Sequence, residues 1–317
     1  MTRIIVTGGA GRLGRSLIAG LAGRGHELVS LDREISTAPE LADIAQHTVD
    51  LTDPDAATRT IAEAIDGDPD SALVHLAAIA VPFSAPEDVI LRTNAVLALN
   101  TLGAGVAAGI PKIVTASSPT VLGYHCPTGW LPERFPLDEE TIPKPWHAYG
   151  LSKHLAEQTM AMLARQTGEA TRFAAFRPCY VIAPEEWEGA PTQQGHTVRE
   201  RLDDPALSAP ALFNYVDARD VASFVDVLLE ALPEIPNAEL FFVGADDALA
   251  REPLAELLPR FVPGSERLAS VLTGTAPAFS NAKAKHALGW HPAHTWRSEL
   301  REPPPTTPST LRKGVTT

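Results

Sequence analysis

A glycine-rich turn near the N-terminus constrains the fold of this chain most strongly. Residues 7–14 read Thr-Gly-Gly-Ala-Gly-Arg-Leu-Gly and directly follow a short apolar run at residues 3–6. Gly8 permits a tight turn, Gly11 lets the backbone approach a pyrophosphate, and Gly14 lets the next helix pack closely on the strand. The N-terminus of that helix offers unpaired N–H groups and a partial positive charge to phosphates. The cofactor-binding residues predicted on this turn are Gly8, Gly11, Arg12, Leu13 and Gly14.

An acid at the end of the second predicted strand indicates which dinucleotide is bound. The carboxylate of Asp32 is placed to accept hydrogen bonds from the adenosine ribose and to repel a 2′-phosphate, which favours NAD over NADP. Arg33 beside it is an alternative holder of that phosphate and would reverse the preference. Segments after the third and fourth strands are expected near the adenine and along the cofactor backbone, and their residues are Asp50, Leu51, Leu76, Ala77 and Ala78.

Short β-rich runs alternate with longer helical segments through the first 180 residues. Strands are predicted at residues 3–6, 27–31, 47–49, 72–76, 112–116 and 171–176, and helices at about 12–23, 54–65, 87–108 and 147–167. The strand cores are continuously apolar, which is typical of strands buried on both faces of a parallel sheet. This order implies right-handed β-α-β crossovers and a Rossmann-type, doubly wound parallel sheet of the α/β class.

The pattern changes after residue 178, where Pro, Gly, Gln and charged residues become frequent up to residue 213. A helix at about 217–231 and a strand at 239–243 resume the first pattern. We therefore predict an NAD-binding Rossmann domain of residues 1–176 plus 214–243, and a small C-terminal substrate lobe of residues 177–213 plus 244–300. Residues 301–317 form a Pro-rich tail with three consecutive prolines.

A tyrosine and a lysine in the fourth helical segment are candidates for acid/base chemistry. Tyr149 and Lys153 are four residues apart and share one face of a helix. A phenol has an ordinary pKa of about 10, and a nearby ammonium group stabilises the phenolate and lowers that pKa. The lysine is also placed to hold the nicotinamide ribose. The alternative is that the pair is an ordinary core tyrosine and surface lysine.

Two serines follow the fifth predicted strand, at the edge where open α/β sheets bind ligands. The hydroxyl of Ser117 or Ser118 is expected to bond the reacting oxygen and orient it toward Tyr149. The alternative for these serines is an ordinary turn or helix cap. Asn94 is a candidate to position a water or a backbone group behind Lys153, or else it makes ordinary polar bonds within its helix.

Taken in order, these segments resemble the extended short-chain dehydrogenases/reductases of the NAD-dependent epimerase/dehydratase family. The resemblance covers about residues 3–300, and its further motifs are His75 to Ala78, Ser117 to Gly123, Arg177-Pro178, Tyr215 to Val221 and Leu288 to Trp290. It implies NAD as cofactor and a homodimer formed by the segments 87–108 and 147–167. The implied catalytic residues are Tyr149, Lys153, Ser118 and Asn94, and the implied substrate-binding residues are Ser117, Ser118, Tyr149 and Arg177.

Two departures from the family pattern narrow the chemistry. Family dehydratases carry two acids where this chain has Pro119 and Thr120, so elimination of water is not expected. The segment between Arg177 and Tyr215 is short for holding a nucleotide sugar, and the segment after Ser117 is similar to that of uronate dehydrogenases. We expect an NAD-dependent dehydrogenase or epimerase for a sugar-like alcohol. The alternatives are a nucleotide-sugar 4-epimerase and a non-catalytic NAD-binding regulator.

Composition excludes several other classes of protein. The formal net charge of −13 argues against nucleic acid or an anionic membrane as partner. No uninterrupted apolar run reaches the roughly 20 residues that span a bilayer, and the N-terminus lacks the layout of a signal peptide. The two cysteines, Cys126 and Cys179, do not form a disulfide framework, which favours a reducing, cytoplasmic location. No metal is expected, because the histidines show no ligand spacing.

Overall fold

The computed structural model describes residues 2–302, and within them the main sheet has seven strands in the order β3-β2-β1-β4-β5-β6-β9. All neighbouring strands in it are parallel. The strands are β1 (Arg3–Thr7), β2 (Glu27–Asp32), β3 (Ala45–Thr48), β4 (Ala72–His75), β5 (Lys112–Ala116), β6 (Arg172–Pro178) and β9 (Glu239–Val243). The predicted Rossmann-type α/β fold is confirmed.

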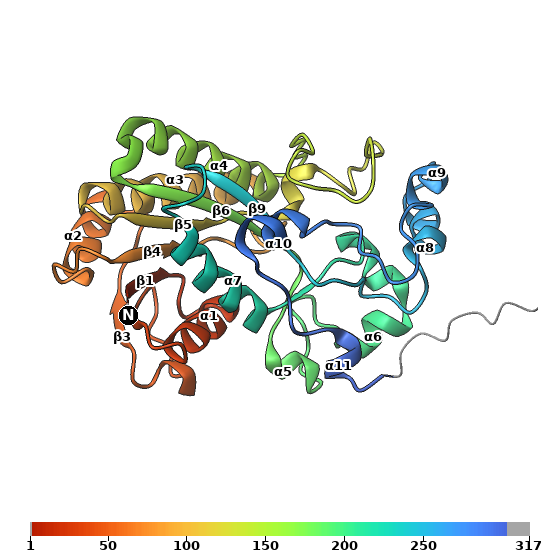
Figure 1. Cartoon of the computed structure of the whole chain (residues 1–317), viewed down its shortest axis with the longest axis horizontal. Helices are drawn as coiled ribbons and strands as arrows, with labels where there is room; N and C mark the ends of the chain where they lie inside the picture. The colour runs from red at the N-terminus through yellow and green to blue at the C-terminus, as the bar shows by residue number, and fades with distance from the viewer. Residues whose placement is uncertain (1, 303–317) are drawn as a thin grey trace, which may run out of the picture.

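Five long helices cover the two faces of this sheet (Figure 1). One face carries α1 (Arg12–Ala22) and α7 (Ala218–Ala231), which pack on each other. The other face carries α2 (Pro54–Ala64), α3 (Glu87–Ala107) and α4 (Ala148–Thr167), with α3 between the other two. Neighbouring residues of one strand therefore enter different cores: Ile4 packs with Leu17 of α1, and Ile5 packs with Leu102 of α3. Burial on both faces accounts for the apolar strand sequences.

The order of strands reverses at β1, and this reversal positions the functional site. Thr7 is in register with Leu31 of β2 on one side and with His75 of β4 on the other. The hydroxyl of Thr7 also bonds Nδ1 of His75 at 2.8 Å, between the ends of the two strands. The loops that leave β1 and β4 therefore start side by side, at the switch point where sheets of this kind bind ligands.

Helix ends follow local sequence signals. Asp53 caps α2, because its side chain accepts hydrogen bonds from the backbone N–H groups of Asp55 (2.9 Å) and Ala56 (3.1 Å). His147 caps α4 by accepting from the N–H of Gly150 at 3.1 Å. The observed bounds differ from the predicted ones by two residues or fewer. The largest differences are at β3, which starts two residues earlier than predicted, and at β6, which continues to Pro178 because it pairs with β9 over its whole end.

Short elements make up residues 179–213 and 244–302, which lie mainly at the opposite end of the molecule from α2 (Figure 1). A two-stranded parallel sheet pairs β7 (Val181–Ile182) of the first segment with β8 (Val216–Asp217), which directly precedes α7. The short helices are α5 (Pro184–Trp187), α6 (Val198–Asp203), α8 (Leu254–Phe261), α9 (Glu266–Ala269), α10 (Ala282–Leu288) and α11 (Trp296–Glu299). Single 3-10 turns occur at η1 (Pro39–Leu41), η2 (Pro119–Leu122), η3 (Gly168–Ala170), η4 (Pro205–Leu207) and η5 (Ala209–Ala211).

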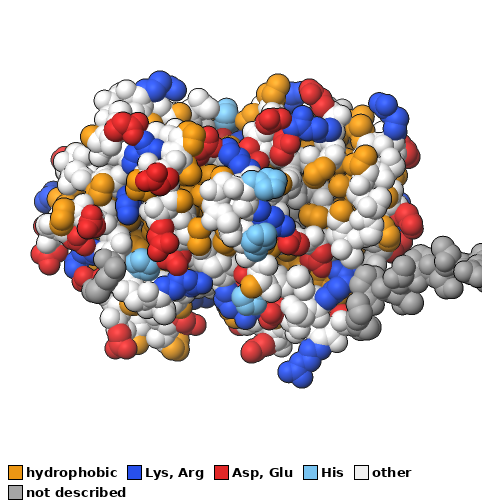
Figure 2. All heavy atoms as spheres, viewed as in Figure 1, with side chains coloured by type: hydrophobic (Ala, Val, Ile, Leu, Met, Phe, Trp, Pro, Cys, Tyr) orange, Lys and Arg blue, Asp and Glu red, His pale blue; other side chains and the backbone are white. Residues whose placement is uncertain are grey.

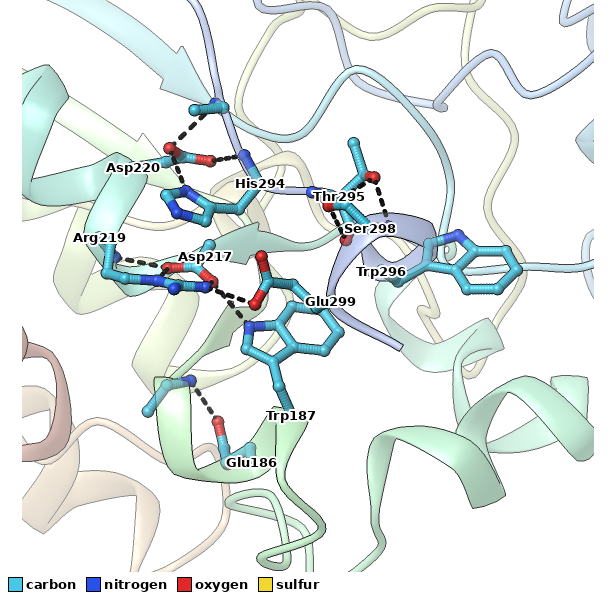
Figure 3. A network of polar contacts seen from close by, with 12 residues as sticks. Glu186, Trp187, Asp217, Arg219, Asp220, His294, Thr295, Trp296, Ser298 and Glu299 are labelled. Atoms are coloured by element: carbon cyan, nitrogen blue, oxygen red, sulfur yellow. Dashed lines mark hydrogen bonds and ion pairs between the residues drawn. The ribbon is translucent and has the colours of Figure 1, made fainter. Parts of the chain in front are cut away.

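A buried polar network ties these short elements to the N-terminus of α7 (Figure 3). Asp217 accepts a 2.7 Å hydrogen bond from the indole of Trp187 in α5 and pairs with Arg219 at 2.6 Å. Arg219 also pairs with Glu299 of α11 at 2.8 Å. Asp217 is fully buried, and a buried carboxylate is tolerated only when it is paired in this way. The network therefore anchors α5 and α11 to the Rossmann part of the chain.

Four further predictions are compared with the structure here. By length and composition alone, α3 is apolar enough to cross a membrane, but it packs between α2 and α4 and 44% of its most apolar window is buried. Both cysteines are free thiols. Most of the predicted tail, residues 303–317, lies outside the described residues. Acidic and basic side chains are interspersed on the face that Figure 2 shows, without a basic patch.

Candidate active site

A large cavity opens at the carboxyl ends of the strands. Its volume is about 840 Å³. Every residue that the sequence predicts for cofactor binding lines it, namely Gly8, Gly11, Arg12, Leu13, Gly14, Asp32, Asp50, Leu51, Leu76, Ala77, Ala78 and Lys153. Ser117, Ser118 and Tyr149 line the same cavity. The structure therefore brings the predicted cofactor residues together with Ser117, Ser118 and Tyr149 in the same cavity.

The glycine turn leaves no room for side chains. Gly8 has φ +75°, and a Cβ atom there would lie 2.8 Å from the backbone nitrogen of Ala77. A Cβ atom on Gly14 would lie 2.2 Å from the carbonyl oxygen of Gly8. Gly11 precedes α1 and has no side chain with which to cap it, so the first N–H groups of the helix stay available to phosphates. This cradle fits the pyrophosphate of a dinucleotide.

Asp32 lies at the end of β2 against the same turn. Its carboxylate accepts hydrogen bonds from the N–H of Ala10 at 3.0 Å and of Arg33 at 2.7 Å. These bonds hold the negative charge beside the glycine turn, as the preference for NAD requires. The side chain of Arg12 lines the cavity and pairs with Glu186 of α5, and its Nη2 lies 3.5 Å from the carbonyl oxygen of Pro191. The glycine turn is thereby connected to α5.

Tyr149 and Lys153 lie on the first two turns of α4 and face the end of β5. The Nζ atom of Lys153 donates a 2.9 Å hydrogen bond to the carbonyl oxygen of Ala116. The Oγ atom of Ser118 accepts from the hydroxyl of Thr120 at 2.9 Å and from its N–H at 3.3 Å. Ser118 thus caps the turn η2, which is the structural role that the sequence left open, and it still lines the cavity.

Two predicted residues stay outside the cavity. Arg177 is 1% exposed, and its Nε and Nη2 atoms donate to Glu157 at 2.8 and 2.9 Å. The expectation that Arg177 contacts substrate is therefore not supported by its position, because the buried guanidinium is neutralised by Glu157 instead. Asn94 binds the backbone of Ile79 (2.8 and 3.1 Å) and the hydroxyl of Ser152 (3.0 Å). Asn94 is thus a positioning residue for a backbone group, one of its expected roles.

Comparison with known proteins identifies the family. The model of the NAD dependent epimerase/dehydratase family matches residues 4–244. The chain belongs to this family. Its cofactor is NAD, and it is an NAD-dependent dehydrogenase or epimerase of the extended short-chain dehydrogenase/reductase type.

Its relatives include both kinds of enzyme. A uronate dehydrogenase from Agrobacterium fabrum is 30% identical over 212 residues, which are 67% of this chain and 74% of that protein. A UDP-glucose 4-epimerase from Corynebacterium glutamicum is 26% identical over 92% of both chains. The structure of UDP-glucose 4-epimerase from Brucella ovis in complex with NAD has a TM-score of 0.70 at 19% identity, over 95% of this chain and 97% of that one. That likeness shows the fold.

Burial dominates the acid/base properties of this family member's site. It raises the pKa of Tyr149 to about 12, and the hydrogen bond with Ser118 opposes this rise. Burial also lowers the pKa of Lys153 to about 8, against the effect of the negative charge on Glu157. The expected lowering of the Tyr149 pKa is therefore wrong for this structure. The reason is that both groups lose water, while the ammonium group bonds to Ala116 and not to the phenol.

Sequence reasoning missed part of the cavity wall. Phe83, Trp146, His147 and Gln193 line the cavity but belong to no recognisable motif. Phe83 comes from the loop before α3, Trp146 and His147 come just before α4, and Gln193 comes from the segment between α5 and α6. The only local signal was the pair of aromatic rings that directly precedes the Tyr149 segment. Within residues 2–302, no group of three or more His, Cys, Asp or Glu side chains is arranged to hold a metal ion.

Proposed function

We propose that this chain is a dehydrogenase that oxidises a hydroxyl group of a sugar-like alcohol with NAD. The observation that carries the proposal is that Tyr149, Ser118 and Lys153 line the same cavity as the glycine turn and Asp32. When bound, NAD supplies the hydride acceptor. The Tyr149 phenolate takes the hydroxyl proton of the substrate, and Ser118 holds the same oxygen in place. Lys153 adds a positive charge beside the phenol and a donor for the nicotinamide ribose.

Two comparisons support this proposal and its alternative. The relative named uronate dehydrogenase supports net oxidation of a sugar derivative. The relative named UDP-glucose 4-epimerase, aligned over 92% of this chain, supports the alternative of a nucleotide-sugar 4-epimerase. Pro119 and Thr120 begin the turn η2, so neither of these positions offers the acid that a dehydratase needs. The presence of both Tyr149 and Lys153 disfavours a regulator without turnover.

The test is to incubate the full chain with NAD and a panel of aldoses, uronic acids and nucleotide sugars. A dehydrogenase releases NADH in proportion to the substrate consumed, which is followed by the absorbance of the reduced nicotinamide. A 4-epimerase interconverts two nucleotide sugars without net NADH, which chromatography detects. If NAD binds but no compound in the panel is changed in either way, the regulator becomes the better description.

The remaining expectations complete the proposal. We propose a homodimer, because Leu99 of α3 and Leu151, Leu155 and Met162 of α4 are exposed apolar side chains on a packed helix pair. We also propose a cytoplasmic protein that does not bind membranes or nucleic acid, as its net charge favours. Residues 177–213 and 244–300 are proposed as the substrate lobe, which is supported by the contribution of Tyr180, Gln194 and their neighbours to the cavity.

A further inference from the structure

Three aromatic side chains form a wall beside Tyr149. Phe83, Trp146 and His147 all line the cavity, and we call them the aromatic wall. Their ring centres are 5.7 Å (Phe83 to Trp146), 5.4 Å (Phe83 to His147) and 4.9 Å (Trp146 to His147) apart. The ring of His147 is also nearly parallel to that of Tyr149, at 6.3 Å and 11°. An apolar surface therefore continues directly from the proton-transferring phenol.

Phe83 combines an exposed ring with an unfavourable backbone conformation. Its side chain is 59% exposed, although phenylalanine is usually buried. Its φ is +63°, in the left-handed region that bulky residues rarely adopt. Backbone strain of this kind clusters at ligand-binding positions, where bound molecules use the strained geometry. An exposed ring at the mouth of a cavity is suited to cover a ligand that enters.

The charged side chains that line the cavity come from the glycine turn, the ends of β2 and β3, and α4. Among the described residues that line it, the Arg and Lys side chains are Arg12, Arg33 and Lys153, and the acids are Asp32, Glu34 and Asp50. Arg12 already pairs with Glu186, and Lys153 already bonds Ala116. None of these six charged side chains belongs to the aromatic wall. A carboxylate or diphosphate there would lose water without gaining a partner.

Another cation lies close behind the lining but is covered. The guanidinium of Arg201 stacks 4.1 Å from the ring centre of Tyr180, and its Nη1 atom donates to the side chain of Gln194 at 2.5 Å. Tyr180 and Gln194 line the cavity, whereas Arg201 does not. The ring of Tyr180 and the amide of Gln194 therefore separate this charge from a ligand.

Neutral hydrogen-bonding groups are available instead. The Nδ1 atom of His147 accepts from the N–H of Gly150, so its proton sits on Nε2, and burial lowers the pKa of the ring and keeps it neutral. The Nε2 atom of His125 donates to the carbonyl oxygen of Ala209 at 2.8 Å, and His125 also lines the cavity. The amide of Gln193 adds a neutral donor and acceptor to the lining. Groups of this kind bind hydroxyls without requiring charge.

Resting on the proposed function, we infer that the substrate is an uncharged monosaccharide-sized alcohol, one face of whose ring packs on the aromatic wall. The C–H groups of such a ring meet the negative faces of Phe83 and Trp146. Its hydroxyls bond the ring nitrogens of His147 and His125 and the amide of Gln193. The same wall disfavours uronic acids and nucleotide sugars, because both bring negative charge to a surface without an uncovered cation.

The first test compares sugars that carry either a hydroxymethyl group or a carboxylate at C6. The full chain is assayed with NAD on galactose and galacturonate and on glucose and glucuronate, with UDP-galactose assayed for interconversion. We expect kcat/KM to be at least about 10-fold higher for the neutral sugar of the preferred pair. A preference for the uronate or for UDP-galactose would overturn the inference and leave the proposed NAD chemistry standing. If nothing in the panel is turned over, the proposed function fails and the inference fails with it.

The second test removes one ring of the wall. Phe83→Ala should raise KM for the neutral sugar roughly 3- to 10-fold and change kcat less than about twofold, since the ring contacts substrate and not the reacting atoms. Phe83→Tyr keeps the ring and should retain the KM of the natural chain. The control is Ile142→Ala, which truncates another exposed apolar side chain outside the cavity and should change neither constant. An unchanged KM in Phe83→Ala would show that the wall does not bind substrate.

Discussion

The ammonium group of Lys153 lies 5.9 Å from the centre of the Tyr149 ring, and the two side chains are only 6% and 9% exposed. The ammonium group bonds the carbonyl oxygen of Ala116 and not the phenol. Burial of both groups leaves little water to screen their charges. We therefore expect the two residues to act together in acid/base chemistry and their roles to be separable by mutation.

Substitutions in this unit should differ in a defined order. Tyr149→Phe removes one oxygen and should lower turnover by at least about 10²-fold, as is typical of losing a general acid/base, while NAD binding survives. Lys153→Met should lose activity and also weaken NAD binding. Ser118→Ala should be milder than Tyr149→Phe, because it removes an orienting bond. Steady-state kinetics and NAD titration measure all three, and near-normal turnover in Tyr149→Phe would disprove the mechanism.

The pH profile of oxidation should rise and then level off. Oxidation needs the Tyr149 phenolate, whose phenol has a pKa of about 12, and the charged form of Lys153, whose pKa is about 8. Below pH 8 the phenolate fraction grows tenfold per pH unit while the lysine stays charged, so log kcat/KM should rise with unit slope. Above pH 8 loss of the ammonium form cancels this gain, and the profile becomes flat. In Lys153→Met the residual activity should continue to rise above pH 8, and a flat profile there would contradict this account.

Asp32 should decide between the two nicotinamide dinucleotides. In the natural chain NAD should bind at least about tenfold more tightly than NADP, or about 1.4 kcal/mol, because the carboxylate repels a 2′-phosphate. Asp32→Ala should remove most of this difference. Calorimetric titration with both cofactors is the measurement. Equal affinities in the natural chain would instead assign control of the pocket to Arg33, which also lines it.

The exposed apolar face of α3 and α4 should hold two copies together. Sedimentation at micromolar concentration should show a species of twice the 33.8 kDa chain mass. Leu155→Glu places a charge on that face and should shift the equilibrium to the monomer. Val271→Glu is the matched control, because Val271 is also exposed but lies away from these helices. A natural chain that sediments only as a monomer would exclude the proposed dimer.

His75 should make the stability of the fold depend on pH. Burial lowers its pKa to about 3, whereas the unfolded chain has a value of about 6.5. Between about pH 3 and 6.5, His75 is protonated in the unfolded chain and neutral in the folded chain. The contribution of neutral His75 to the free energy of unfolding is therefore intact above pH 6.5. It is lost by up to about 1.4 kcal/mol per pH unit as the pH falls toward 3. Urea unfolding of the natural chain and His75→Gln should show a shallower decline for the variant, and equal slopes would argue against this assignment.

Local sequence was enough to predict the strands, the long helices and a set of residues that line one cavity. The glycine turn, Asp32 and the Ala77-Ala78 segment each act through backbone that lies within a few residues of a strand end. In a parallel sheet these ends meet at one edge, so the position of each residue along its strand already places it in the cavity. Tyr149 and Lys153 are four residues apart, so helix geometry alone predicts that they share one face of α4.

Other outcomes depended on residues that only the folded chain brings together. Arg177 lies near the end of β6, where the motif predicted a substrate contact. Its guanidinium pairs with Glu157 of α4 instead, because an unpaired guanidinium in the interior would be costly. The pKa of Tyr149 depends on how completely the surrounding chain removes water. The aromatic wall joins Phe83 from one loop with rings from another. The sequence by itself determined the fold, the cofactor and the candidate reacting groups, since they rely on local backbone and on spacing along one helix. The tertiary structure decided the pairing of Arg177, the burial of Tyr149 and the assembly of the aromatic wall, since those arise from contacts between distant segments.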